Sequence, residues 1–113
     1  MTFKSGIYSF LAVILLVGSV DVYAEEVWID VRSLAEYQAD HIEGDQRITH
    51  NEIVSGVQKL GLSKDTTIHL YCRSGGRAGK ALKALNVAGY ANVVNQDGID
   101  DARETRGIEN SDY

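Results

Sequence analysis

One segment in the middle of the chain constrains the fold more than any other. Thr67 to Tyr71 form a β-branched and aromatic run that is typical of a buried strand. A glycine-containing loop, Cys72 to Arg77, follows at once, and Ala78 to Ala88 then place apolar residues on one helical face. Gly89 is a natural helix stop. A strand, a tight loop and a helix in direct succession favour an α/β fold with a parallel sheet.

The sequence before this unit continues the alternation of short strands and helices. Val27 to Val31 is a β-branched and aromatic run that predicts a buried strand. Ser33 and Glu36 have the spacing of a capping box, so we expect a short helix to follow. We interpret Asp30 and Arg32 as an ion pair that holds the end of this strand rather than as catalytic groups.

Weaker patterns predict the remaining elements. We expect a short strand around Ile48, and then a helix that Asn51 caps and that runs to Leu60. The apolar face of this helix consists of Ile53, Val54, Val57 and Leu60. Asn92 to Val94 form the last predicted strand, and we expect the polar tail after Arg103 to be loosely held.

The N-terminus has the features of a secretory signal. The 113 residues allow one domain. Lys4 precedes an apolar run from Ile7 to Val20, and the small residue Ala24 stands just before the expected cleavage site. The run is shorter than the roughly 20 apolar residues of a membrane span, so we favour a cleaved signal over a retained anchor. We therefore predict a signal peptide over residues 1–24, a folded domain over 25–113, a periplasmic location and no stable membrane anchor.

Composition excludes several classes of partner. The net charge is −5 and there is no basic run, which predicts no binding to nucleic acid. His50 and His69 lack further ligands at the spacing of a zinc site. We interpret Asp97, Asp100 and Asp101 as a solvated face, since the calcium-loop pattern is absent. The sequence predicts no metal site and no cofactor.

The loop after the central strand is the candidate site. Cys72 is the only cysteine, and it follows a strand whose end should face the crevice where ligands bind in parallel sheets. Loop amides, the next helix N-terminus and two arginines, Arg73 and Arg77, all favour the thiolate over the thiol. Gly75 and Gly76 permit the backbone angles of such a cradle. The alternative interpretation is a buried structural cysteine.

Three stretches resemble the rhodanese family, in order and at the family's spacing. The first runs from Asp30-Val31-Arg32 to His41-Ile42-Glu43-Gly44. The second is the loop Cys72 to Arg77 with the start of its helix, and the third runs from Gly89-Tyr90 to Gly98-Ile99. The resemblance implies a rhodanese-like α/β fold with about five mostly parallel strands flanked by helices. It is strongest with small periplasmic thiosulfate sulfurtransferases.

The resemblance also implies a reaction. Cys72 would attack the sulfane sulfur of a small anionic donor such as thiosulfate and carry it as a persulfide to cyanide or a thiol. The substrate would be held by Arg73, Ser74, Gly75, Gly76 and Arg77. The loop has four residues between Cys72 and Arg77, which resembles sulfurtransferases rather than the related phosphatases with five.

Two departures from the family pattern leave a second function open. Gly76 stands where the family commonly has Asn, and Ala78 stands where it commonly has Ser. Fewer side chains then contact the sulfur, so the alternative is a persulfide carrier or sulfur-binding module without turnover. A phosphatase or arsenate-reducing relative is the third candidate, and the loop length argues against it.

Overall fold

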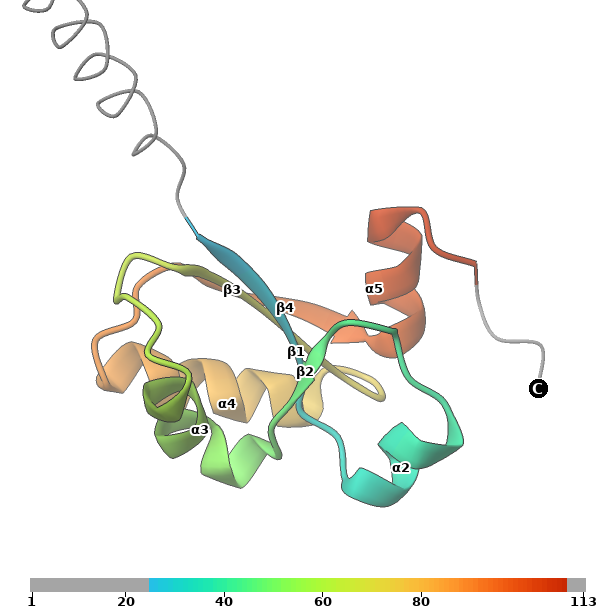
Figure 1. Cartoon of the computed structure of the whole chain (residues 1–113), viewed down its shortest axis with the longest axis horizontal. Helices are drawn as coiled ribbons and strands as arrows, with labels where there is room; N and C mark the ends of the chain where they lie inside the picture. Colours follow the sequence, from blue (N-terminus) through green and yellow to red (C-terminus); the bar gives the residue numbers. More distant parts are fainter. Residues whose placement is uncertain (1–24, 110–113) are drawn as a thin grey trace, which may run out of the picture.

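The computed structural model describes residues 25–109 (Figure 1). The predicted signal peptide, residues 1–24, lies outside the described residues, as do residues 110–113. Within 25–109, no helix has the length and apolar character needed to cross a bilayer.

The centre of the fold is a parallel sheet, as the sequence predicts. Its strands are β1 (Glu26–Asp30), β2 (Gln46–Arg47), β3 (Thr67–Cys72) and β4 (Val93–Gly98). Their spatial order is β2-β1-β3-β4, and every neighbouring pair is parallel. Residues 25–109 thus contain four strands, where the sequence predicts about five.

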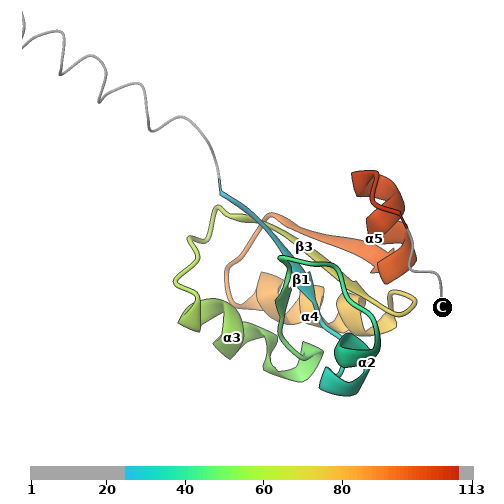
Figure 2. The same cartoon turned by 45° about the vertical axis from the view of Figure 1, so that its right-hand side comes forward.

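Helices cover both faces of this sheet (Figures 1 and 2). They are α2 (Leu34–Ala39), the 3₁₀ turn η1 (His50–Glu52), α3 (Ile53–Lys59), α4 (Gly76–Val87) and α5 (Ile99–Arg106). The pair α3 and α4 packs on one face, α5 packs on the other, and α2 lies beyond the end of β1. This is the layered arrangement expected when helices connect parallel strands.

The core has two parts, one on each face of the sheet. Successive residues of β3 point to opposite faces, so Ile68, Leu70 and Cys72 face α3 and α4 while Tyr71 faces α5. The larger cluster also contains Ile29, Val31, Ile53, Val57, Ala78, Ala81, Leu85 and Tyr90. The smaller cluster adds Ile42, Ile99 and Ala102 to Tyr71. The candidate cysteine therefore lies on the better packed side of the sheet.

The helix predicted from Asn51 to Leu60 differs at both ends. It begins as a 3₁₀ turn at His50, and Asn51 lies inside this turn rather than at a cap. The reason is that the His50 amide still donates to the Val31 carbonyl, so the chain follows β1 up to that residue. The helix ends at Lys59, and Leu60, predicted to belong to its apolar face, is the C-cap residue and 40% exposed.

The predicted loose tail after Arg103 is wrong as far as Arg106, because α5 continues to that residue, and residues 110–113 lie outside the described residues. The strand extends from Val93 to Gly98, and α5 follows it directly. Arg103 is 4% exposed and forms two hydrogen bonds with Asp40, 2.7 and 2.9 Å long. Arg106 bonds to Asp45 at 2.7 Å. Ion pairs to distant carboxylates therefore hold a helix that has little apolar surface of its own.

Candidate active site

Cys72 is the last residue of β3 and is almost completely buried, with 1% of its surface exposed. It pairs in register with Gly98, just after an irregularity between Leu70 and Cys72. A Cβ atom on Gly98 would lie 2.4 Å from the Arg73 carbonyl oxygen, so only glycine fits there. The end of β4 thus packs tightly against the residue that follows the cysteine.

Backbone amides surround the Cys72 sulfur. The Gly75 N–H donates to Sγ at 2.9 Å, and Gly75 adopts the left-handed conformation with φ of 102°. Burial acts to raise the pKa of the thiol, but hydrogen bonds from the amides of Ala78, Ser74, Gly75 and Arg77 outweigh it, so the pKa is lowered. The backbone amides of the loop therefore shift the equilibrium of Cys72 toward the thiolate.

The side chain of Arg77 is bound by a carboxylate from α2. Its Nη1 and Nη2 donate to the two carboxylate oxygens of Glu36 at 2.7 and 2.9 Å. The hydrogen bond from Arg77 lowers the pKa of Glu36 to about 2. Glu36 is in turn fixed by its capping box with Ser33, whose N–H and hydroxyl both donate to Oε1. The predicted substrate-binding arginine lies at the site, but its charge is already paired.

The other predicted binding residues line the same loop. Arg73 and Ser74 are exposed, while Gly75 is buried in the turn. A Cβ atom on Gly76 would meet nothing within 4 Å, so that side of the loop is open. Within residues 25–109, Arg73 takes part in none of the ion pairs. Arg73 is therefore the loop cation whose charge is not offset by a bonded carboxylate.

The end of β1 forms the ion-pair network expected from the sequence. Arg32 donates to both oxygens of Asp30, at distances between 2.8 and 3.1 Å, and Asp30 is fully buried. The Arg32 guanidinium also donates to the Asp40 carbonyl oxygen at 2.6 Å. Both polar groups are used within this network, which agrees with a structural role for the pair.

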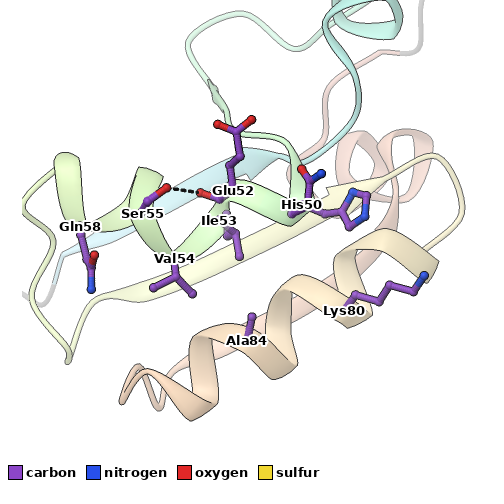
Figure 3. Close-up of a pocket in the computed structure, with 9 residues that line it drawn as sticks. His50, Glu52, Ile53, Val54, Ser55, Gln58, Lys80 and Ala84 are labelled. Carbon is purple, nitrogen blue, oxygen red and sulfur yellow. Dashed lines mark hydrogen bonds between the residues drawn. The ribbon is translucent and has the colours of Figure 1, made fainter.

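A surface groove lies between η1–α3 and α4 (Figure 3). Its volume is about 500 Å³, and its lining combines polar His50, Gln58 and Lys80 with apolar Val54 and Ala84. The imidazole Nδ1 of His50 is buried without a hydrogen-bond partner. No residue from Cys72 to Arg77 lines this groove, so the groove and the amide cradle are separate features.

Comparisons with known proteins agree with this geometry. The family model for the rhodanese-like domain matches residues 18–98. Thiosulfate sulfurtransferase PspE of Escherichia coli K12 is 35% identical over 99 residues, which cover 88% of this chain and 91% of PspE. The probable adenylyltransferase/sulfurtransferase MoeZ of Mycobacterium tuberculosis is 40% identical over 70 residues, which cover 62% of this chain but 18% of MoeZ.

Solved structures give the same result for the fold. A rhodanese with anions from E. coli superposes with a TM-score of 0.63 at 34% identity, covering 67% of this chain and 89% of that one. The rhodanese-like domain of the Anabaena protein Alr3790 has a TM-score of 0.67 at 22% identity, covering 83% and 89%, and supports the fold alone. The resemblance drawn from the three sequence stretches is thus confirmed, and the chain belongs to the family of rhodanese-like domains.

Proposed function

We propose that this protein is a sulfurtransferase that moves a sulfane sulfur from thiosulfate, or a related small anionic donor, to a thiol or cyanide. One observation carries the proposal: the only cysteine of the chain ends a buried strand and faces backbone amides that lower its pKa. A thiolate in such a cradle is a nucleophile next to an anion-binding site. Membership of the rhodanese-like family and the similarity to PspE support the same class of reaction.

The first half-reaction forms a persulfide on Cys72. The thiolate attacks the outer sulfur of thiosulfate, a new S–S bond forms, and the original S–S bond breaks. Sulfite leaves with the electron pair, so three negative charges enter and three remain. The terminal persulfide sulfur is anionic and needs hydrogen-bond donors. The amides of Ser74, Gly75, Arg77 and Ala78 already point to this region and are suited to receive it.

The second half-reaction returns the thiolate. Cyanide or a thiolate acceptor attacks the terminal sulfur, and the persulfide S–S bond breaks toward Cys72. The products are thiocyanate or an acceptor persulfide, together with the free Cys72 thiolate. No external oxidant or reductant is needed, because the sulfane sulfur moves between nucleophiles at a constant oxidation state.

Within this proposal, different loop residues bind different parts of the dianionic donor. The backbone of Ser74, Gly75 and Gly76 holds the donor oxygens and the transferred sulfur, and Arg73 attracts the anion with an unpaired charge. Arg77 contributes a charge that Glu36 partly offsets. A site of this kind suits a small dianion better than a bulky, highly charged one.

The second candidate function is a carrier that holds the persulfide without rapid turnover. The specific observation that favours it is the open space at Gly76, where an added Cβ atom would meet nothing within 4 Å. A persulfide held by backbone donors alone is less enclosed than one that side chains also cover. The carrier and the enzyme share the first half-reaction and differ in the second.

The proposed location is the periplasm. Only the sequence of residues 1–24, with its apolar run and small residues before Glu25, supports export. Fractionation of cells that express the full chain, with the mass of the mature N-terminus, tests this proposal. Retention of residues 1–24 in the exported protein would favour the membrane anchor instead.

The reaction is tested with thiosulfate and cyanide. The purified protein should produce thiocyanate over many turnovers, and Cys72→Ser should produce none while unfolding at an unchanged urea concentration. Equal rates in the two proteins would refute the proposal. A stable gain of one sulfur on Cys72 by mass spectrometry, with negligible turnover, would identify the carrier. Release of phosphate from an aryl phosphate would revive the phosphatase interpretation.

A further inference from the structure

Two residues of β4 contact the cysteine loop from outside the loop itself. The Asn95 side-chain Nδ2 donates to the Gly75 carbonyl oxygen at 3.0 Å. A Cβ atom on Gly75 would lie 3.1 Å from the Asp97 carboxylate Oδ1 and 3.3 Å from the Asp97 Cα, so Asp97 packs directly against the turn. The loop is therefore supported by a strand that lies more than twenty positions later in the sequence.

Asn95 is itself held in one orientation. Its Oδ1 accepts a hydrogen bond from the Asp97 N–H at 2.8 Å, while its Nδ2 donates to Gly75. Both ends of the amide are used, which fixes the positions of its oxygen and nitrogen atoms. Asp97 adopts a left-handed backbone with φ of 66°, a conformation uncommon for a residue other than glycine. The Asn95 hydrogen bond to the Asp97 amide supports that conformation.

Gly75 joins the cysteine loop to the start of α4. Its N–H donates to the Cys72 sulfur, and its carbonyl accepts from the Gly79 amide in the first turn of α4. As a glycine with φ of 102°, it has no Cβ to restrict rotation. The amides of Arg77 and Ala78 follow directly in α4. A small rotation at Gly75 would change the direction of the donors on both sides of it.

We infer that Asn95 is a positioning residue that fixes the Gly75 carbonyl and so directs the loop and helix amides toward the Cys72 sulfur. The inference rests on the proposed role of Cys72 as the nucleophile, and it names the residue that keeps its thiolate stable. Asn95 makes no hydrogen bond to the Cys72 sulfur, and its hydrogen bond to the loop ends on the Gly75 carbonyl, so its effect passes through Gly75. Its loss should weaken thiolate stabilisation rather than remove the cysteine from the site.

The charged groups around the site do not account for this effect. Arg77 and Asp30 interact with the region electrostatically, Arg73 follows the cysteine, and Asp97 lies beside Gly75. Asn95→Leu adds no charge but also removes the bond to the Asp97 amide, whereas Asn95→Asp keeps that bond and adds a charge. The two variants share only the loss of the donor to the Gly75 carbonyl, so a change in Cys72 reactivity that occurs in both reports the geometry of the amides.

The test measures alkylation of the single cysteine by iodoacetamide between pH 5 and pH 10. Asn95→Asp keeps the oxygen that accepts from the Asp97 amide but removes the donor to Gly75. Asn95→Leu removes both bonds and adds no charge. The matched control is Asn92→Asp, because the Asn92 Nδ2 makes the same kind of bond, to the Asp65 carbonyl at 3.0 Å, at the opposite end of β4.

The expected result is a change in the pH dependence. Loss of about one charge-assisted hydrogen bond should reduce the thiolate fraction at pH 5 about tenfold. A thiolate of higher pKa is intrinsically more nucleophilic, so the rate at pH 10 should stay equal or rise up to about threefold. The ratio of the rate at pH 10 to the rate at pH 5 should therefore grow several-fold to tenfold in both Asn95 variants and stay unchanged in Asn92→Asp.

Three outcomes would overturn the inference: ratios that match the original protein in both Asn95 variants, an equal change in Asn92→Asp, or a change in Asn95→Asp alone. The last would mean that added charge, not lost geometry, is the cause. Asn95→Leu keeps the test valid if Asn95→Asp fails to fold, as monitored by Trp28 fluorescence in urea. Alkylation needs no sulfur transfer, so an inactive original protein would refute the proposed function and leave this result intact.

Discussion

The ion pair between Glu36 and Arg77 joins α2 to the start of α4, and Glu36→Gln is the sharpest way to test it. Glutamine has nearly the same shape and keeps one oxygen that can accept from Ser33, but it removes the charge that the Arg77 guanidinium binds. Of the two hydrogen bonds from Arg77, 2.7 and 2.9 Å long, one is lost because an amide nitrogen cannot accept, and the other loses the carboxylate charge. We expect a loss of stability that depends on pH.

The size of the loss follows from the pKa of Glu36. The fall of this pKa from the ordinary value of 4.5 to about 2 corresponds to about 3 kcal/mol of stability if solvent screening is ignored. The side chains of Glu36 and Arg77 are 27% and 30% exposed, so solvent screening reduces this contribution to stability. We expect Glu36→Gln to lower the free energy of unfolding by about 1–2 kcal/mol at pH 7.

The sign of the pH dependence is fixed by the direction of the shift. A carboxylate whose pKa is lowered by folding contributes stability above its unfolded pKa, and this stability is lost as pH falls through its folded pKa. The difference between the original protein and Glu36→Gln should thus be full above about pH 5, fall as the pH drops toward 2, and vanish below about pH 2.

Urea unfolding at several pH values, followed by the fluorescence of Trp28, the only tryptophan, measures this difference. Glu43→Gln is the matched control, because it removes an equal charge from a carboxylate that is 92% exposed in its pair with His41. A loss in Glu36→Gln no larger than in this control at pH 7, or a loss at pH 2 as large as that at pH 7, would refute the reasoning.

Three further predictions follow from the same contacts. Cys72 should be alkylated by iodoacetamide at pH values where an ordinary thiol, with a pKa of about 8.5, is protonated, and unfolding in urea should remove this advantage, because its pKa is lowered only by the folded loop. Gly98→Ala should lower the free energy of unfolding by about 1–3 kcal/mol in a urea titration, because its Cβ would lie 2.4 Å from the Arg73 carbonyl oxygen. Gly76→Ala, with open space around the added Cβ, should change the free energy of unfolding by less than about 0.5 kcal/mol in the same titration. Arg103→Leu should lower the free energy of unfolding by about 2–3 kcal/mol, because the buried guanidinium binds Asp40 through two hydrogen bonds. Thermal unfolding of the variant in which α5 melts no earlier than in the original protein would contradict this prediction.

The parts of the fold that depend on local patterns could be predicted from the sequence. The strand before Cys72 and the helix after it carry dense apolar patterns, and both occur where expected. The capping box of Ser33 and Glu36 is a signal within four consecutive residues and is present in full. These elements need no knowledge of distant residues.

The parts that depend on distant partners could not be predicted. Helix α5 has little apolar surface, and its anchors are Asp40 and Asp45, which lie about sixty positions earlier. Nothing in the local sequence around Arg103 indicates this partnership. The sequence also places Glu36 in a cap and Arg77 in a binding loop, with no sign that the two meet across 41 positions.

The support that β4 gives to the cysteine loop could not be predicted either, because it depends on a distant partner. Asn95 lies in a short polar run, where a surface role is the simplest interpretation. Its hydrogen bond to Gly75 exists only because β4 pairs with β3 in one particular register. Site residues within the cysteine loop could be found from composition and spacing, whereas the residues that support the loop could not.

The position of β4 next to Cys72 also bears on the order in which the site is completed during synthesis. The chain is made from its N-terminus, so Cys72 and its loop emerge well before Gly98, the residue with which Cys72 pairs. A chain that has not yet reached β4 lacks the Asn95 hydrogen bond to the loop and the glycine that packs against Arg73. The cysteine loop is therefore completed by the last strand of the sheet to be made.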